Sequence, residues 1–290
     1  MGQFPGKNTN IEPYWDSIKR IIIESDLVLE ILDARLVELS RNEEVERLAN
    51  EIGRPVIFVA NKSDLANKDD VKESLEKLKN EGKCVIFVST KKPKTMRLLL
   101  YLIKKTFKKY GKREIPKRKK GDPKEIHRLA KADIVISVLG YPNVGKSSII
   151  NALAHKKKSA VSKKAGTTHG VHWIRINEEI KLIDSPGVIP LKREDEIRYG
   201  LIGARDNETL KNPDIVAYAV IKYFMKRDKT PFERIYGIEI TKEEVQNEDA
   251  YSIVEKVAQK RHFMLKGGVT DENRACAMIL RDWQEGKLRL

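Results

Sequence analysis

The stretch GYPNVGKSS, from Gly140 to Ser148, decides the class of fold. It matches the phosphate-binding pattern G-x-x-x-x-G-K-[ST], and it lies between an apolar run typical of a strand and a helical pattern, as the match requires. Glycines let backbone N–H groups turn toward phosphate oxygens, and a helix N-terminus adds its positive dipole end. We expect Lys146 to reach the β- and γ-phosphates and the Ser147 hydroxyl to hold Mg²⁺. The residues expected to contact the nucleotide here are Asn143, Val144, Gly145, Lys146, Ser147 and Ser148.

Short apolar runs alternate with helical patterns on both sides of this stretch. The runs are 27–32, 55–60, 84–88 and 134–139, and the helical patterns between them are 43–53, 68–80 and 93–109. Runs of this kind suit strands buried on both faces, and their alternation with helices predicts a mostly parallel sheet with helices on both faces. Two further strands, 171–176 and 180–184, are close enough to form a hairpin. A helix over 11–24 is expected to pack on the core, and in 93–109 we expect Leu98 and Tyr101 on the apolar side.

The strand signals stop after about residue 193. Asn212-Pro213 is typical of a helix start, with Asn as the cap and Pro at the first helical position. Further helices are predicted over 250–261 and 270–285, with Gly286 as the stop. The sequence thus predicts an α/β domain over 1–193, with a basic linker at about 110–132, and a small α-helical domain over 194–290.

Two loops have the composition of a nucleotide-dependent switch. Asp184-Ser185-Pro186-Gly187 follows an expected strand, so that Asp184 could hold Mg²⁺ and the Gly187 N–H could sense a γ-phosphate. Gly166-Thr167-Thr168 lies between this loop and the phosphate loop, where a Mg²⁺-binding threonine is expected. We favour Thr168 as the metal ligand, with Thr167 as the alternative.

The stretch Asn61-Lys62-Ser63-Asp64 indicates which base is bound. A carboxylate such as that of Asp64 can accept hydrogen bonds from N1–H and the 2-amino group of guanine, whereas adenine lacks this pair of donors. Asn61 and Lys62 belong to the same element, and Ser89, Thr90 and Lys91 follow the next strand, where they would support the base. The expected ligands are therefore GTP and GDP.

The order of these motifs is unusual. The base-reading element comes first, at 61–64, and the phosphate loop follows at 140–147. A parallel sheet tolerates such an order if the old termini are joined and a new break opens elsewhere. The basic stretch around 110–132 would be the join, and the break would fall after Gly187. The switch then leads directly into the helical domain.

With these motifs in this order, the chain resembles the circularly permuted GTPases of the YlqF/YawG (RbgA-like) family over nearly its whole length. Asp33-Ala34-Arg35 is one of the stretches that carry the resemblance. It implies a P-loop GTPase that acts in assembly of the large ribosomal subunit. It also implies that Asn143 helps to bind K⁺ beside the phosphates. Val188, where a water-orienting Gln would otherwise stand, implies slow intrinsic turnover.

One departure from the family concerns the N-terminus. Bacterial members carry Phe-Pro-Gly-His, and their His is proposed to take part in hydrolysis, whereas this chain has Phe4-Pro5-Gly6-Lys7. A protonated lysine accepts no hydrogen bond, although it can stabilise negative charge on a transferring phosphoryl group. Either Lys7 acts in this way or another residue, such as His169, takes part.

The charge of the chain indicates a polyanionic partner. The formal net charge is +15 and the pI is about 9.6, and residues 104–131 carry thirteen basic and three acidic residues, which is +10 of that total. A second basic cluster comprises Lys156, Lys157, Lys158, Lys163 and Lys164. We expect ribosomal RNA and the large ribosomal subunit as partners. The alternatives are an RNA-binding protein for which GTP is a structural ligand, and a signalling GTPase that binds acidic lipid.

The remaining features favour a cytoplasmic protein, which we expect to be a monomer. Charged residues interrupt every apolar run near the N-terminus, so no signal peptide is expected, and no stretch has the apolar length to span a membrane. The two cysteines, Cys84 and Cys276, lie in apolar stretches and are expected to be reduced core thiols. They cannot supply a metal cluster.

Overall fold

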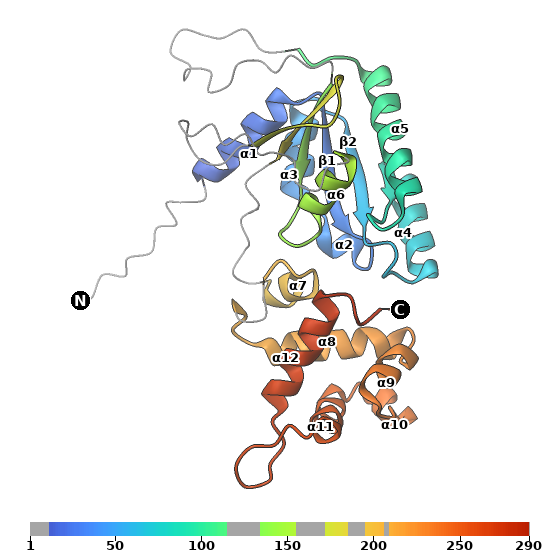
Figure 1. Cartoon of the computed structure of the whole chain (residues 1–290), viewed down its shortest axis with the longest axis vertical. Helices are drawn as coiled ribbons and strands as arrows, with labels where there is room; N and C mark the ends of the chain where they lie inside the picture. The colour runs from blue at the N-terminus through green and yellow to red at the C-terminus, as the bar shows by residue number, and fades with distance from the viewer. Residues whose placement is uncertain (1–11, 115–133, 155–171, 185–194, 206–208, 290) are drawn as a thin grey trace, which may run out of the picture. The chain divides into compact units, whose positions relative to one another are not determined.

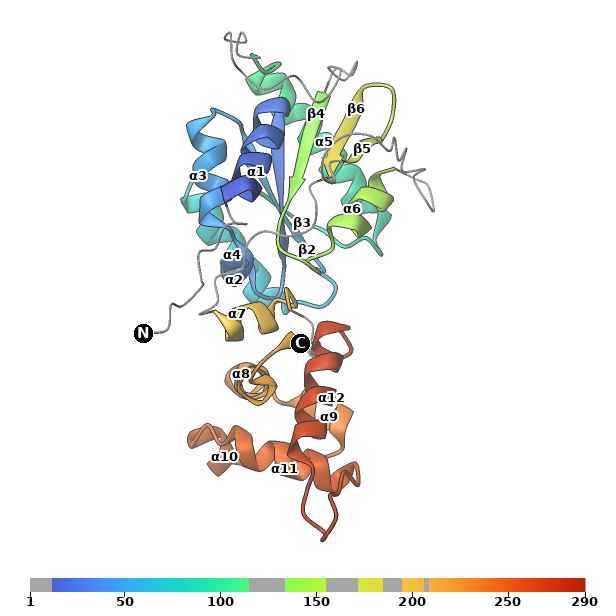
Figure 2. The ribbon, with the colours of Figure 1, turned by 90° about the vertical axis from the view of Figure 1, so that its left-hand side faces the viewer.

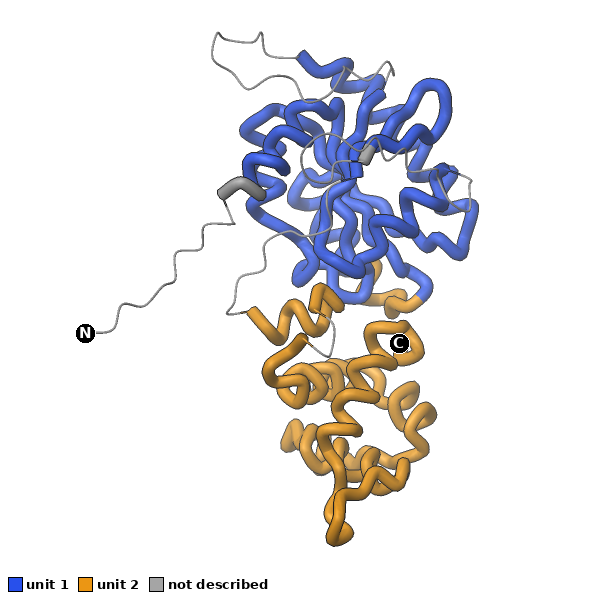
Figure 3. The backbone as a smooth tube through the Cα atoms, turned by 60° about the vertical axis from the view of Figure 1, so that its left-hand side comes forward, with its two compact units in different colours: residues 1–64, 72–190 blue, residues 65–71, 191–290 orange. Residues whose placement is uncertain are grey.

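The computed structural model describes residues 12–114, 134–154, 172–184, 195–205 and 209–289. The chain divides into two compact units (Figure 3). The first, the α/β unit, comprises 1–64 and 72–190, and the second, the helical unit, comprises 65–71 and 191–290. The membership of 65–71 in the helical unit was not predicted. The predicted boundary at 193 lies outside the described residues, as does the predicted linker at about 110–132 except for residues 110–114.

A six-stranded sheet forms the centre of the α/β unit. In chain order its strands are β1 (Leu27–Asp33), β2 (Val56–Asn61), β3 (Cys84–Phe87), β4 (Ile134–Leu139), β5 (His172–Arg175) and β6 (Ile180–Asp184). Across the sheet they lie in the order β3-β2-β1-β4-β6-β5, and all neighbours are parallel except β5 and β6. The predicted fold class, including the β5–β6 hairpin, is confirmed.

Burial follows the position of each strand in the sheet. Every residue of β1 and of β4, which lie side by side at the centre, is buried, as expected for strands that helices cover on both faces. The edge strand β3 is only half-buried. Its first residue, Cys84, is therefore a half-buried thiol rather than the core thiol predicted, whereas Cys276 is buried, and both are free.

Helices cover both faces of the sheet. They are α1 (Glu12–Glu24), α2 (Val37–Ser40), α3 (Glu43–Glu51), α4 (Lys68–Asn80), α5 (Pro93–Tyr110) and α6 (Lys146–Leu153). Helix α1 packs against α3, and α5 packs against α6, on opposite sides of the sheet (Figures 1 and 2). Ile18, Ile21 and Ile22 bury one side of α1, as predicted. The predicted helix over 93–109 is present as α5, but its predicted apolar side was wrong, because Leu98 and Tyr101 are exposed and the buried residues are Met96, Leu99 and Ile103.

The topology collects the polar motifs at one edge of the sheet. Chain order runs outward from β1 through β2 to β3, returns to β4 beside β1, and continues to β6. The point between β1 and β4 is thus a topological switch point, where parallel α/β sheets bind ligands beyond the carboxyl ends of the strands. Asp33, Asn61, Gly140 and Asp184 all lie at or just after such an end.

Six helices lie within the described residues of 195–289 in the helical unit. They are α7 (Glu196–Leu201), α8 (Pro213–Lys226), α9 (Thr230–Tyr236), α10 (Lys242–Gln246), α11 (Ala250–Lys260) and α12 (Glu272–Gln284). Helix α8 packs against α7, α11 and α12 around the fully buried rings of Phe224, Phe232 and Trp283. Gly286 has φ +75° just after α12 and ends it, as predicted. Asn212 precedes α8 as predicted, but its side chain donates to Glu196 instead of capping the helix.

Segment 65–71 is anchored in the helical unit. The Asp70 carboxylate accepts hydrogen bonds from Arg227 Nε at 2.7 Å and from Tyr223 Oη at 3.1 Å. Leu65 lies against Gly286, where a Cβ would come within 2.5 Å of the leucine side chain. Among the described helices, none combines the length and the apolar character needed to cross a membrane.

Candidate nucleotide-binding site

The phosphate loop requires glycine at two positions. Gly140 has φ +146°, and a Cβ there would lie 2.5 Å from the carbonyl oxygen of Ile31 on β1. Gly145 has φ +103°, and a Cβ there would lie 2.2 Å from Asn61 Nδ2. Real Cβ atoms do not approach other atoms so closely, and both backbone conformations favour glycine. The loop between β4 and α6 therefore lies directly against the ends of β1 and β2.

Lys146 points into this loop. Its side chain is buried, and Nζ donates to the carbonyl oxygens of Gly140 at 2.8 Å and Tyr141 at 2.7 Å. Burial lowers the pKa of Lys146 to about 8, against the opposing field of Asp184. An ammonium held by carbonyl dipoles in a desolvated loop gains strongly from an added anion, such as a phosphate group.

The carboxylate of Asp184 comes from the neighbouring strand. Asp184 ends β6 in register with Val138 of β4, and its charge acts on Lys146. Ser147, the first residue after Lys146, is exposed. A hydroxyl and a carboxylate are hard oxygen ligands suited to Mg²⁺, so Ser147 and Asp184 could hold this ion. Among the described residues no group of three or more His, Cys, Asp or Glu side chains forms a metal cluster.

The carboxylate of Asp64 accepts hydrogen bonds from two side chains, those of Ser89 and Lys91. Its Oδ1 accepts from Ser89 Oγ at 2.7 Å, and its Oδ2 accepts from Lys91 Nζ at 2.9 Å. Burial pushes the pKa of Asp64 upward, but the hydrogen bonds from Lys91 and Ser89 outweigh it and keep the pKa below its ordinary value. Asp64 is therefore an ionised acceptor at neutral pH, as guanine recognition requires.

Backbone contacts shape the loop that supports Asp64. Ser63 N donates to Val88 O at 3.1 Å, which ties the base-reading element to the end of β3. Ser89 N donates to Thr95 Oγ1 at 3.1 Å, and that hydroxyl donates to Ser89 O at 2.9 Å. Thr90 and Lys91 follow in the same loop. The structure thus brings Asp64, Ser89 and Lys91 together.

Asn61 joins the base-reading element to the phosphate loop. Its Nδ2 donates to the carbonyl oxygen of Val144 at 3.0 Å, and both residues are buried. Asn143, next to Val144, has φ +59°, in the left-handed region that asparagine tolerates better than most residues. Elements separated by some eighty residues therefore form one site.

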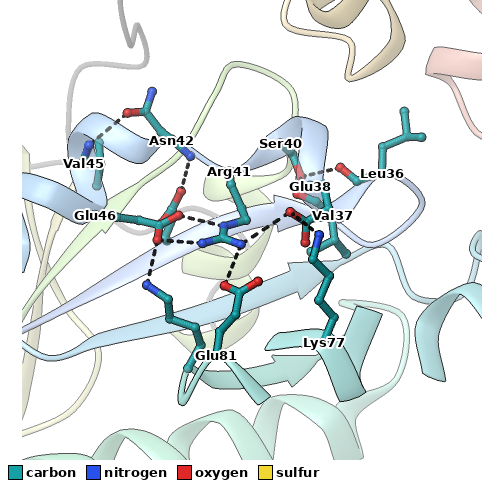
Figure 4. A network of polar contacts seen from close by, with 12 residues as sticks. Leu36, Val37, Glu38, Ser40, Arg41, Asn42, Val45, Glu46, Lys77 and Glu81 are labelled. Carbon is teal, nitrogen blue, oxygen red and sulfur yellow. Dashed lines mark hydrogen bonds and ion pairs between the residues drawn. The ribbon is translucent and has the colours of Figure 1, made fainter. Parts of the chain in front are cut away.

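A buried chain of hydrogen bonds supports the phosphate loop from β1. Tyr141 Oη accepts from Asn42 Nδ2 at 3.0 Å, and Asn42 N donates to Glu30 Oε1 at 2.7 Å. Asn42 also caps α3, since its Oδ1 accepts from Val45 N (Figure 4). No sequence motif identified this chain, because its members are common residue types scattered over three elements.

Glu30 is the buried end of that chain. Burial and the neighbouring Glu46 raise its pKa to about 8, against the opposing effects of the Asn42 hydrogen bond and of Arg41 and Lys83. Glu30 Oε2 has no hydrogen-bond partner among the described residues. Arg41 and Glu46 pair with each other in the ion-pair cluster of Figure 4, which also includes Glu38 and Glu81. Glu30 is therefore protonated in the folded protein at neutral pH.

Replacing Glu30 by glutamine should remove a pH-dependent loss of stability. The folded-state pKa lies above the unfolded value of 4.5, so the unfolded chain binds fewer protons and the free energy of unfolding falls as pH rises from about 4.5 to about 8. The shift sets an upper bound of about 5 kcal/mol on this loss. Denaturant unfolding of both proteins at pH 5.5, 7 and 8.5 would measure it. The exposed Glu38→Gln serves as the control, and parallel pH profiles for wild type and Glu30→Gln would contradict the prediction.

Several predicted site residues cannot be placed. Lys7, Thr167, Thr168, His169, Gly187 and Val188 lie outside the described residues. Their roles in hydrolysis, Mg²⁺ binding and switching stay predictions. The described members of the predicted site, in contrast, line the carboxyl edge of the sheet between β3 and β6.

The fold and the site define a P-loop GTPase domain with its motifs in circularly permuted order. The family model described as 50S ribosome-binding GTPase matches residues 135–265. An uncharacterized GTP-binding protein of Methanocaldococcus jannaschii is 35% identical over 272 residues, which are 93% of this chain and 65% of that protein. The chain thus spans just under two thirds of the length of this relative.

Shorter relatives match over most of their length. Ribosome biogenesis GTPase A of Bacillus cereus is 28% identical over 91% of this chain and 84% of its own. The probable ribosome biogenesis GTPase A of Mycoplasma genitalium is 29% identical over 98% of this chain and 93% of its own length. The crystal structure of GNP-bound YlqF from T. maritima has the same fold, with a TM-score of 0.59 and 22% identity over 96% of this chain and 95% of that one. These comparisons support a YlqF/RbgA-like circularly permuted GTPase.

Proposed function

We propose that this protein binds and hydrolyses GTP and acts in assembly of the large ribosomal subunit, with the bound nucleotide controlling its affinity for ribosomal RNA. The observation that carries the nucleotide part is the Asn61–Val144 hydrogen bond, which joins a guanine-reading element to a phosphate loop. The subunit part is supported by the relatives named ribosome biogenesis GTPase A. A monomer in the cytoplasm is the proposed state.

Each part of the site has a role in this proposal. Asp64 accepts the guanine donors, and the backbone N–H groups after Gly140 bind the phosphates. Lys146 exchanges the carbonyl oxygens of its own loop for β- and γ-phosphate oxygens and stabilises the charge that develops on them. Ser147, Thr168 and Asp184 would hold Mg²⁺, which neutralises phosphate charge when bound. Gly187 would respond to the γ-phosphate, and Lys7 would stabilise the transferring group.

Helix α5 offers a surface suited to an RNA backbone. Its exposed side combines basic residues with apolar and aromatic ones, namely Lys94, Arg97, Leu98, Tyr101, Lys105, Lys108 and Lys109. Tyr101 is 65% exposed, and a ring flanked by lysines suits stacking on bases beside phosphate contacts. Arg113, by contrast, is buried against Asp26 and does not contribute to this surface.

Sedimentation with purified large ribosomal subunits tests the proposal. The protein should bind more tightly with a non-hydrolysable GTP analogue than with GDP, and by linkage the subunit should favour GTP to the same degree. Binding should weaken steeply as salt rises, because phosphate contacts release counterions. Equal binding in both nucleotide states would leave GTP as a structural ligand. Preference for acidic vesicles over subunits would favour a membrane-associated GTPase instead.

Potassium should accelerate hydrolysis. We propose Asn143 as a K⁺ ligand beside the phosphates, and its left-handed backbone places it at the exposed rim of the loop. At matched ionic strength, turnover should be at least severalfold faster in KCl than in NaCl, and Asn143→Gly, which keeps the backbone conformation, should lose that difference. Phosphate release in the two salts measures the effect. Equal wild-type rates in both salts would exclude a K⁺ site.

A further inference from the structure

The end of β1 holds an aspartate that no nucleotide motif requires. Asp33 is fully buried, and its carboxylate is surrounded by donors from two elements. Oδ1 accepts from Arg35 N at 3.1 Å and Arg35 Nε at 3.0 Å, and Oδ2 accepts from Arg35 Nη2 at 2.8 Å. The remaining contact of Oδ2 is Lys62 Nζ, at 2.9 Å. One buried carboxylate therefore holds two cations in fixed positions.

The backbone fixes the same geometry. Asp33 and Asn61 lie side by side in the β1–β2 register, and Ala34 N donates to Asn61 O at 2.7 Å. Asp33 N donates to Ser40 Oγ at 3.0 Å, so the aspartate is held from its main chain as well. Its carboxylate consequently has little freedom to follow a displaced lysine.

Lys62 lies between the two residues that define the base site. Asn61 holds the phosphate loop through Val144, and Asp64 carries the guanine-reading carboxylate. Lys62 has φ +62°, a left-handed conformation that L side chains adopt rarely. With Nζ held at Asp33 and the backbone held at this φ, the aliphatic stem of Lys62 has little conformational freedom. A restrained methylene chain of this kind offers an apolar surface to a planar base.

We propose that Asp33 is a positioning residue for guanine binding, which acts by fixing the Lys62 side chain, with Arg35 holding the Asp33 carboxylate. This inference rests on the proposed guanine-nucleotide function and extends it to Asp33 and Arg35, which lie outside the base-reading element and the phosphate loop. Burial alone would raise the pKa of Asp33, but Arg35 and Lys62 keep it well below its ordinary value, so the restraint persists throughout the neutral range.

The same strand supplies a matched control. Asp26, just before β1, is equally buried, and its carboxylate accepts from Arg113 Nη1 at 3.0 Å, Arg113 N at 2.9 Å and Val135 N at 2.6 Å. It lies at the amino end of β1, opposite the edge that carries the nucleotide motifs. Asp26→Asn and Asp33→Asn therefore remove comparable buried aspartate–arginine pairs, but only Asp33→Asn also releases Lys62.

Titration of a fluorescent GDP analogue against these variants tests the proposal. We expect Asp33→Asn to weaken GDP binding about tenfold and to raise KM for GTP by a similar factor, while kcat stays within about twofold, because a base contact acts equally on the ground and transition states. Asp26→Asn should lower thermal stability with GDP affinity unchanged.

A double-mutant cycle separates positioning from mere structure. Lys62→Met keeps the aliphatic stem and removes the ammonium, so Asp33→Asn should cost less than threefold in GDP affinity in that background. The inference is overturned if Asp33→Asn binds GDP like wild type, if Asp26→Asn weakens binding equally, or if the loss is the same in the Lys62→Met background. Wild-type protein that binds ADP as well as GDP would instead reject the proposed function itself.

Discussion

Replacing Asp64 by asparagine should convert a site for guanine nucleotides into one that favours xanthine nucleotides. The ionised carboxylate of Asp64 accepts from Ser89 and Lys91 and presents acceptors only, which complements the N1–H and 2-amino donors of guanine. Xanthine carries a carbonyl oxygen in place of the 2-amino group. An asparagine amide can donate to that oxygen, whereas the carboxylate repels it.

The expected change in preference is large. Sites built to hydrogen-bond a particular donor reject analogues that leave the buried group unpaired by factors of about 10⁴. We expect the ratio of GDP to XDP affinity to fall by about 10³-fold or more in Asp64→Asn, as measured by competition against a fluorescent nucleotide. The exposed Asp69→Asn, on α4, is the control and should keep the wild-type ratio. An unchanged ratio in Asp64→Asn would exclude Asp64 as the base reader.

The sequence predicted the sheet and its ligand edge because both depend on local patterns. The runs that became β1, β2 and β4 are nearly continuous in apolar residues, and this pattern predicts a strand that is buried on both faces. The glycines of the phosphate loop were recognisable for a related reason. Gly140 and Gly145 adopt left-handed backbone conformations against neighbouring strands, which restricts the residue type.

Contacts between distant elements could not be predicted in this way. The Asn42 side chain caps α3, which is a contact local in sequence, and it also donates a hydrogen bond to Tyr141 of the phosphate loop. Asp33 and Lys62 belong to separate motifs, and their ion pair depends on the register of β1 with β2. The local sequence around Asn42 does not indicate Tyr141 as its partner, and the local sequence around Asp33 does not indicate Lys62.

Exposure on α5 was mispredicted for a comparable reason. Helical spacing is compatible with either of two adjacent sides, and the hydrophobic residues Leu98 and Tyr101 favoured the wrong one. The orientation of α5 about its axis follows from the burial of Met96, Leu99 and Ile103 in the α/β unit. Apolar residues left on a lysine-rich side are then available for a partner.

Replacing Lys146 by methionine should abolish most of the turnover while stabilising the nucleotide-free protein. Lys146 Nζ donates to two carbonyl groups of the phosphate loop, and loss of a positioned charge stabiliser typically costs about a hundredfold to a thousandfold in kcat. Methionine keeps the length and apolar character of the stem. Phosphate release under single-turnover conditions, with the protein in saturating excess over GTP, measures the loss of the chemical step separately from weaker binding.

The stability effect has the opposite sign because the lysine is buried at a cost. Its folded-state pKa of about 8 lies below the ordinary value of 10.5, so below pH 8 the folded protein carries a desolvated charge, and this cost disappears as pH rises from about 8 to 10.5. Lys146→Met should therefore raise the thermal midpoint of the nucleotide-free protein at pH 7, and its advantage should shrink toward pH 10. GTP should protect the wild type far more than the variant, since bound phosphates stabilise the ammonium. If Lys146→Met is less stable than wild type at pH 7, or if its gain in thermal midpoint is independent of pH, burial of the charged lysine does not destabilise the nucleotide-free protein.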